Sequence, residues 1–70
     1  MKLNHKQGID IAVARTGMTH EKFYTKLGIQ NRQTWINWRE KGNLKLREAQ
    51  AIADVAGITL YELIDDMKVR

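Results

Sequence analysis

The spacing of apolar residues is helical from one end of the chain to the other, and this feature excludes most folds. Apolar side chains recur three and four positions apart, and no segment shows the strict alternation of a half-buried strand. The sequence has no proline, no low-complexity tract and no internal repeat. Its 70 residues suffice for one small core. We therefore expect a single all-α domain over residues 1–70.

Capping residues and glycines predict where helices begin and end outside the central segment. A first helix is expected from about Asn4, which stands in capping-box spacing with Gln7, to Gly17. A fourth helix is expected after Gly42 and ends at Gly57. Its apolar stripe comprises Ala49, Ile52, Ala53 and Ala56.

A last, fifth helix is predicted by a second capping box, formed by Thr59 and Glu62. The residues expected to pack against the core are Leu60, Leu63 and Ile64. Tyr61 and Met67 are expected on another side of this helix. The surface that we expect to be available for a protein contact comprises Tyr61, Ile64, Met67 and Val69.

Residues 19–42 hold the most informative segment, because they form two short amphipathic helices joined at a glycine. Thr19 is a good cap for the first helix, in which Phe23 and Leu27 share a buried face. Gly28 suits the left-handed conformation that ends a helix. Asn31 is a good cap for the next helix. The pattern is a helix-turn-helix signature.

The second helix of this pair separates apolar from polar side chains. Trp35 and Trp38, three positions apart, are expected to face inward as core residues. Arg32, Gln33 and Asn37 then face outward. Guanidinium and amide groups are the side chains that read base edges in the major groove, so the segment points toward DNA.

Charge is distributed unevenly along the chain, whose formal net charge is +4. Residues 20–47 hold seven Lys or Arg against two Glu, a net charge of +5. Residues 48–70 hold two basic against five acidic side chains, a net charge of −3. The basic part coincides with the helix pair, which favours a polyanionic partner over simple solvation of a helical surface.

Several function classes are not expected from this sequence. There is no cysteine, and only His5 and His20 offer imidazole, so neither a disulfide framework nor a zinc site is expected. Phosphate-binding loops, nucleophile elbows and metal-binding helix motifs are absent from the sequence, so we expect neither an enzyme nor a cofactor. No apolar run approaches a membrane span, and the start, MKLNHKQG, lacks a secretory hydrophobic block. We expect a cytoplasmic protein.

From about Ile9 to Ile64, the chain resembles the lambda-repressor-like, or Cro/CI-type, helix-turn-helix family of phage and bacterial transcriptional regulators. The matching residues are Gly17-Met18-Thr19, Leu27-Gly28-Ile29, Arg32-Gln33-Thr34, Trp38 with Gly42, Ile52-Ala53, and Gly57-Ile58-Thr59-Leu60-Tyr61-Glu62-Leu63-Ile64. The resemblance implies a five-helix domain that reads a double-stranded DNA operator, commonly as a homodimer.

The resemblance also implies roles for individual residues. Arg32 is expected to donate to guanine, and Gln33 or Asn37 to pair with adenine. The expected base contacts are Gln30, Asn31, Arg32, Gln33 and Asn37. His20 stands where the family often has a phosphate-contacting glutamine. The expected phosphate contacts are Thr19, His20, Lys22, Arg39, Lys41, Asn43 and Lys45.

Three features depart from the family pattern and motivate an alternative function. Tyr24 occupies a position that is usually alanine in the family, and the interval from Gly28 to Trp38 is one residue longer than usual. Ile36 is apolar at a position that is often polar and turned toward DNA, where it suits a thymine methyl group or a protein contact. The alternative is an antirepressor or antitoxin-like module that captures a second regulator protein.

Overall fold

The helix α1 (His5–Thr16) is the centre of the fold, and the other helices are arranged around it. They are α2 (His20–Lys26), α3 (Arg32–Glu40), α4 (Leu46–Ala56) and α5 (Leu60–Met67). The computed structural model describes residues 3–42 and 44–68, and within these ranges there is no strand beyond an isolated antiparallel bridge between Leu3 and Lys68. The expectation of a compact all-α domain with five helices is confirmed for this part of the chain. Asn43 and Val69 lie outside the described residues.

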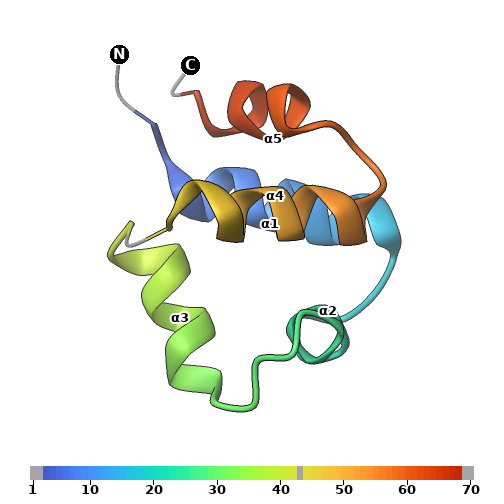
Figure 1. Cartoon of the computed structure of the whole chain (residues 1–70), viewed down its shortest axis with the longest axis vertical. Coiled ribbons are helices and arrows are strands. Elements are labelled where there is room, and N and C mark those ends of the chain that lie inside the picture. Colours follow the sequence, from blue (N-terminus) through green and yellow to red (C-terminus); the bar gives the residue numbers. More distant parts are fainter. Residues whose placement is uncertain (1–2, 43, 69–70) are drawn as a thin grey trace.

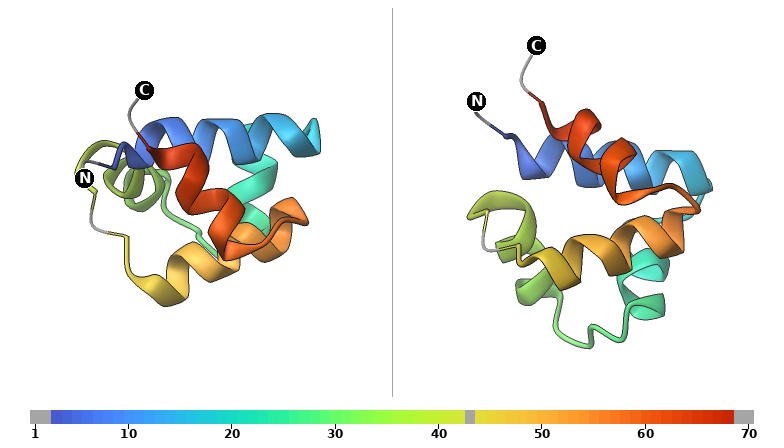
Figure 2. Two further views of the ribbon diagram at one scale, coloured as in Figure 1. Left: turned by 90° about the horizontal axis from the view of Figure 1, so that it is seen from above. Right: turned by 45° about the horizontal axis from the view of Figure 1, so that its top comes forward.

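The molecule is elongated, with different helices at its two ends. The structure is 32 Å along its longest axis, with α5 at one end and α2 and α3 at the other (Figure 1). The helix α1 packs against α3, α4 and α5, and Figure 2 shows α5 on one side of α1 and α4, running obliquely from one to the other. No described helix is both long and apolar enough to cross a membrane. Of the helix pair α2 and α3, the helix α3 packs directly against α1.

The core draws on all five helices. Its buried members are Ile9, Ala12, Val13, Phe23, Trp35, Ala49, Ile52, Ala53, Leu63 and Met67. In α1, α4 and α5, the first buried residue is followed by others three or four positions later, which is the period that the sequence shows. Met18, Leu27, Ile29 and Trp38 are half-buried and pack against this core.

Gln7, expected in a capping box with Asn4, joins the start of α1 to the end of α5 by hydrogen bonds. Asn4 caps α1, since its side-chain oxygen accepts from the backbone N–H of Gln7 at 3.0 Å. The side chain of Gln7 does not accept from the backbone N–H of Asn4, as a capping box requires. Its Nε2 donates instead to the carbonyls of Asp66, at 2.9 Å, and Lys68, at 3.0 Å. The expected reciprocal capping box is therefore wrong, because Gln7 satisfies carbonyls at the end of α5.

The caps of α4 and α5 differ in which atoms they use. The Thr59 hydroxyl accepts from the backbone N–H of Glu62 at 3.1 Å and donates to the Glu62 carboxylate at 3.3 Å. At the start of α4, the Glu48 carboxylate accepts from the backbone N–H of Lys45 at 2.7 Å. Thr59 thus caps α5 as predicted, but Glu62 accepts from the Thr59 hydroxyl and not from its backbone N–H, so the second capping box forms only in part. The bond that stabilises α4 was not expected from the sequence.

One expectation about the outer face of α5 is wrong. Met67 is only 2% exposed, because it packs against Gly8 of α1, so it offers no surface to a protein partner. Tyr61 is 84% exposed, and Ile64 is half-buried. The surface of α5 that remains available is therefore centred on Tyr61.

Candidate nucleic-acid interface

The helix α2 is fixed at both of its ends by local hydrogen bonds. Thr19 caps its start, accepting from the backbone N–H of Lys22 at 3.2 Å. After α2, Gly28 adopts a φ of +85°, which turns the chain so that the Ile29 N–H donates to the Tyr24 carbonyl at 3.0 Å. Phe23 anchors the helix in the core. The turn into α3 is therefore set by the residues that the sequence indicated.

The helix α3 is anchored by an aromatic cluster around Trp35. The side-chain oxygen of Asn31 caps this helix and accepts from the backbone N–H of Gln33 at 2.8 Å. Trp35 is 2% exposed, and its ring lies 5.7 Å from that of Phe23, 5.9 Å from Tyr24 and 6.1 Å from Trp38. The prediction that both tryptophans face inward is confirmed. These contacts fix the rotation of α3 and hence which side chains it turns outward.

The outward residues at the start of α3 gather into one polar surface. Gln30, Asn31, Arg32 and Gln33 are exposed, and Asn37 is half-buried. The Gln33 amide nitrogen donates to the Asn37 side-chain oxygen at 3.1 Å. The pair therefore retains the Gln33 oxygen as an acceptor and the Asn37 nitrogen as a donor, which together complement the N6 and N7 edge of adenine.

His20, at the start of α2, is oriented by Trp35. The Trp35 indole N–H donates to His20 Nδ1 at 3.1 Å, so the proton of the neutral ring is on Nε2. Burial of the ring lowers the pKa of His20 below its ordinary value of 6.5; the positive charge of Arg39 lowers it further, and Asp10 opposes both. Donation by Trp35 requires an unprotonated Nδ1 and also favours the neutral form. The Nε2 atom that carries the proton lies 3.7 Å from Asp10 Oδ1, so His20, the expected phosphate contact, has a carboxylate beside its N–H.

The C-terminal half of α3 is joined to α1 by charged side chains. The Arg39 guanidinium contacts one Asp10 carboxylate oxygen through two nitrogens: Nε donates to it at 3.0 Å, and Nη2 lies 2.9 Å from it. The Arg39 side chain is 20% exposed. The Lys6 ammonium lies 3.5 Å from the Glu40 carboxylate. Sequence reasoning assigned Arg39 to phosphate and missed Asp10, because nothing in α1 alone shows that Asp10 faces α3.

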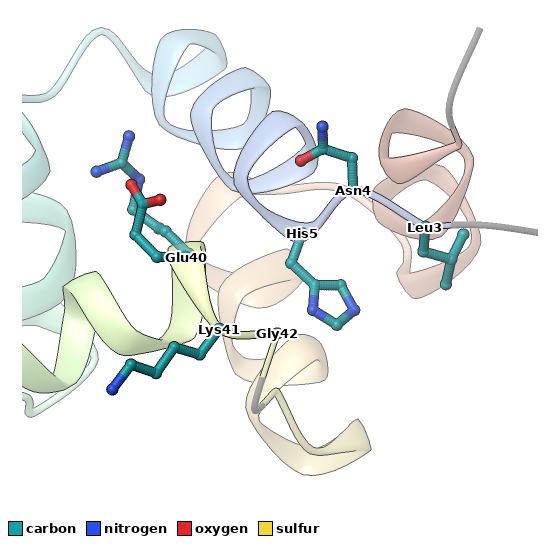
Figure 3. A pocket seen from close by; sticks show the side chains of 7 residues that line it. Leu3, Asn4, His5, Glu40, Lys41 and Gly42 are labelled. Carbon is teal, nitrogen blue, oxygen red and sulfur yellow. The ribbon is translucent and has the colours of Figure 1, made fainter.

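The remaining basic residues of the expected phosphate-contacting set are exposed. Lys22 lies on α2, and Lys41 and Lys45 flank the loop after α3, in which Asn43 is outside the described residues. Figure 3 shows Gly42 beside the His5 ring, with the Lys41 side chain pointing away from that ring. A pocket of about 440 Å³ opens here between the start of α1 and the end of α3.

Tyr24 and Ile36 line a groove between α2 and α3, which we call the α2–α3 groove. It has a volume of about 410 Å³ and is lined by His20, Glu21, Tyr24, Arg32, Trp35, Ile36, Arg39 and Glu40. Tyr24 and Ile36 are half-buried. The groove therefore combines an apolar floor with a charged rim, next to the outward polar residues of α3.

Known proteins give no assignment for this surface. No family model, curated protein or solved structure matches the chain. In residues 3–42 and 44–68, no group of three or more His, Asp or Glu side chains gathers as a metal site. What the surface offers is therefore hydrogen-bonding groups, a charged rim and an apolar floor, which suit recognition.

Proposed function

We propose that the chain is a sequence-specific, double-stranded-DNA-binding transcriptional regulator of the lambda-repressor-like helix-turn-helix type, acting at a phage or mobile-element operator. The observation that carries the proposal is the polar surface at the start of α3, where Arg32, Gln33 and Asn37 are presented by a helix that Trp35 anchors. A helix about 10–12 Å across fits a major groove about 12 Å wide. Occupancy of the operator would block or redirect transcription.

The charge distribution supports the same orientation toward DNA. The basic residues of α2 and α3 lie at one end of the long axis, and the acidic residues of α5 lie at the other (Figure 1). Lys22, Lys41 and Lys45 are exposed around the helix pair and would hold phosphates on both sides of α3. Such contacts position the protein, whereas the α3 side chains specify the sequence.

A homodimer on a palindromic operator fits this proposal. Two copies would place their α3 helices in successive major grooves, about one helical turn of DNA apart. Tyr61, which is 84% exposed on α5, and the half-buried Ile64 are the side chains that we propose for the contact between copies. A regulator of this kind would act in the cytoplasm.

The proposal is tested by selection of binding sites from a random pool of DNA duplexes at physiological salt. We expect a defined sequence to be enriched, and Arg32→Ala to weaken binding by about 1–3 kcal/mol with relaxed preference at one base pair. Gln33→Ala should relax a different position, whereas Lys41→Ala should weaken every sequence about equally. Failure to enrich any sequence, with the protein folded, would refute the proposal.

A second candidate function is capture of another regulator protein, favoured by the half-buried Tyr24 and Ile36 in the α2–α3 groove. In such a module the two side chains would anchor a partner, and Ile36→Asp would abolish capture while Arg32→Ala would have little effect. DNA reading predicts that Arg32→Ala is more damaging than Ile36→Ala. Parallel measurements on DNA and on a co-expressed regulator separate the two functions.

A further inference from the structure

The α2–α3 groove contains apolar surface at the place where base contacts are proposed. Trp35, at 2% exposure, closes its floor, and the ring centroid of Tyr24 lies 5.9 Å from that of Trp35. Ile36 forms part of the wall contributed by α3. The groove thus presents the half-buried side chains of Tyr24 and Ile36 beside polar groups that hydrogen-bond to bases.

The rim of the groove decides which part of a DNA duplex can enter it. Glu21 and Glu40 line the groove together with Arg32 and Arg39. The Arg39 guanidinium is held by Asp10, and the Glu40 carboxylate lies 3.5 Å from the Lys6 ammonium. The other two rim charges, Glu21 and Arg32, are opposite in sign, so the rim has no net positive charge to hold a phosphate. Carboxylates repel phosphate, and Glu accepts readily from the amino group of cytosine. A base edge therefore suits this groove better than the sugar-phosphate backbone does.

Arg32 and Ile36 are four residues apart in α3 and share one face of the helix. One turn of helix separates them by about 5.4 Å along its axis. Successive base pairs are about 3.4 Å apart along the duplex. An apolar group at Ile36 therefore lies one or two base pairs from a guanine bound by Arg32.

We infer, on the basis of the proposed function, that the α2–α3 groove reads the 5-methyl group of a pyrimidine one or two base pairs from the guanine that Arg32 contacts. In the major groove this methyl group marks thymine, and 5-methylcytosine carries the same group at the same position. Ile36 and Tyr24 are the contacting residues. This inference makes Ile36 a specificity-determining residue and gives a role to an apolar side chain that is half-buried in the groove beside Arg32.

The test uses the duplex that the wild-type protein enriches from the random pool. Each thymine is replaced in turn by deoxyuridine, which lacks only the methyl group, and each cytosine by 5-methylcytosine. We expect one deoxyuridine, next to the Arg32 guanine or one base pair further, to weaken binding about fourfold, the effect of burying one methyl group. A gain of similar size from a methylated cytosine at that position would instead identify modified cytosine as the base read.

Two substitutions at one residue then assign the effect to the groove. Ile36→Ala should bind the thymine and deoxyuridine duplexes equally, whereas Ile36→Val, which keeps a branched apolar side chain, should retain most of the discrimination. Thermal unfolding checks that both variants fold. The base-analogue measurements need only the wild-type protein, so they decide the matter even if a variant is unstable.

The outcomes separate this inference from the proposed function. Tight, sequence-specific binding that is unchanged by every base replacement would overturn methyl reading and leave the DNA-binding proposal standing. Failure to enrich any duplex would overturn both. Capture of a second regulator that Ile36→Asp abolishes, without DNA enrichment, would assign the groove to a protein contact and likewise overturn the inference.

Discussion

Gly42, directly after α3, shows how a single residue positions the loop that carries Lys41. Its φ is +66°, and a Cβ at this position would lie 2.9 Å from His5 Nδ1 (Figure 3). We expect Gly42→Ala to lower the free energy of unfolding by about 1–2 kcal/mol for the left-handed backbone alone, with a further loss because the His5 ring must move. Urea unfolding measures the sum.

Gly57 is the matched control for this prediction. Its φ is +73°, and a Cβ there would meet nothing within 4 Å, so Gly57→Ala should show the backbone cost alone. In a His5→Ala background, the loss caused by Gly42→Ala should fall to the Gly57→Ala value. Equal losses for the two alanine variants in the wild-type background would show that His5 does not restrain the loop.

His20 gives the stability a pH dependence whose sign follows from its lowered pKa. Since the pKa of His20 in the folded protein lies below 6.5, the unfolded chain takes up the proton first as the pH falls. The contribution of neutral His20 is therefore complete above about pH 6.5 and is lost as the pH falls through the lower folded-state pKa. Protonation also removes the acceptor for the Trp35 N–H.

The measurement compares wild type with His20→Gln, which does not titrate but keeps an oxygen able to accept from Trp35. Urea unfolding from about pH 7.5 down to about pH 5 should show wild type losing stability relative to the variant. The two proteins differ only at residue 20, so the difference between them reports on His20. A constant difference across this range would mean that the folded and unfolded pKa values of His20 are the same.

Single residues were predictable from the sequence where their partners are local. Asn31 as a cap and Trp35 as a core residue follow from neighbours within a few positions, and both are confirmed. The Trp35–His20 hydrogen bond and the Asp10–Arg39 pair join different helices, across 15 and 29 positions of the chain. Their formation depends on how α1 crosses α2 and α3, which helical period does not determine. The base and phosphate contacts stay predictions.

At the scale of the helices, the contact between α1 and α5 depends on a residue without a side chain. A Cβ at Gly8 would overlap with Met67 Cγ, and Met67 is buried. Gly8→Ala gains about 1 kcal/mol of helix propensity, but the overlap should cost about 1–3 kcal/mol. We therefore expect a net loss of stability in thermal or urea unfolding, in contrast to the usual effect of this substitution in a helix.

A double-mutant cycle isolates the contact. Met67→Ala alone should cost about 2–5 kcal/mol because it leaves a cavity. In that background the methyl group of Gly8→Ala occupies space that Met67 has vacated, so Gly8→Ala should become neutral or stabilising. Additive losses in the double variant would mean that α1 and α5 adjust their spacing without cost.

The residues at which helices begin and end were predictable because capping residues and glycines act locally. Which side of a helix is buried was predicted less completely. The buried position of Met67 was misassigned, although its four-residue interval from Leu63 places both on one face of α5. Tyr61 was correctly placed outside. Gln7 was assigned to a local cap but bonds to the end of α5. Both errors arose where α1 meets α5, a contact between the two ends of the chain.

For the whole molecule, the separation of charge predicts which residues control the salt dependence of DNA binding. Lys22, on α2, is exposed at the basic end, and Glu62, on α5, is exposed at the opposite end of the 32 Å axis (Figure 1). A phosphate contact contributes about 0.9 to the slope of log affinity against log salt. We expect Lys22→Gln to lower that slope by about 1 for each protomer bound, and so by about 2 for the proposed homodimer, and to weaken all DNA sequences about equally.

Glu62→Gln makes a charge change of the same size and opposite sign at the other end of the molecule. The Debye length is about 10 Å at 0.1 M salt, much less than the molecular length, so this variant should leave the slope unchanged. Its amide oxygen can still accept from the Thr59 hydroxyl, which keeps the cap of α5. Affinity measured from about 50 to about 200 mM salt, the range over which phosphate contacts are resolved, compares the two variants. If Glu62→Gln altered the slope as much as Lys22→Gln, DNA would have to approach α5, and the proposed placement of α3 in the major groove would be wrong.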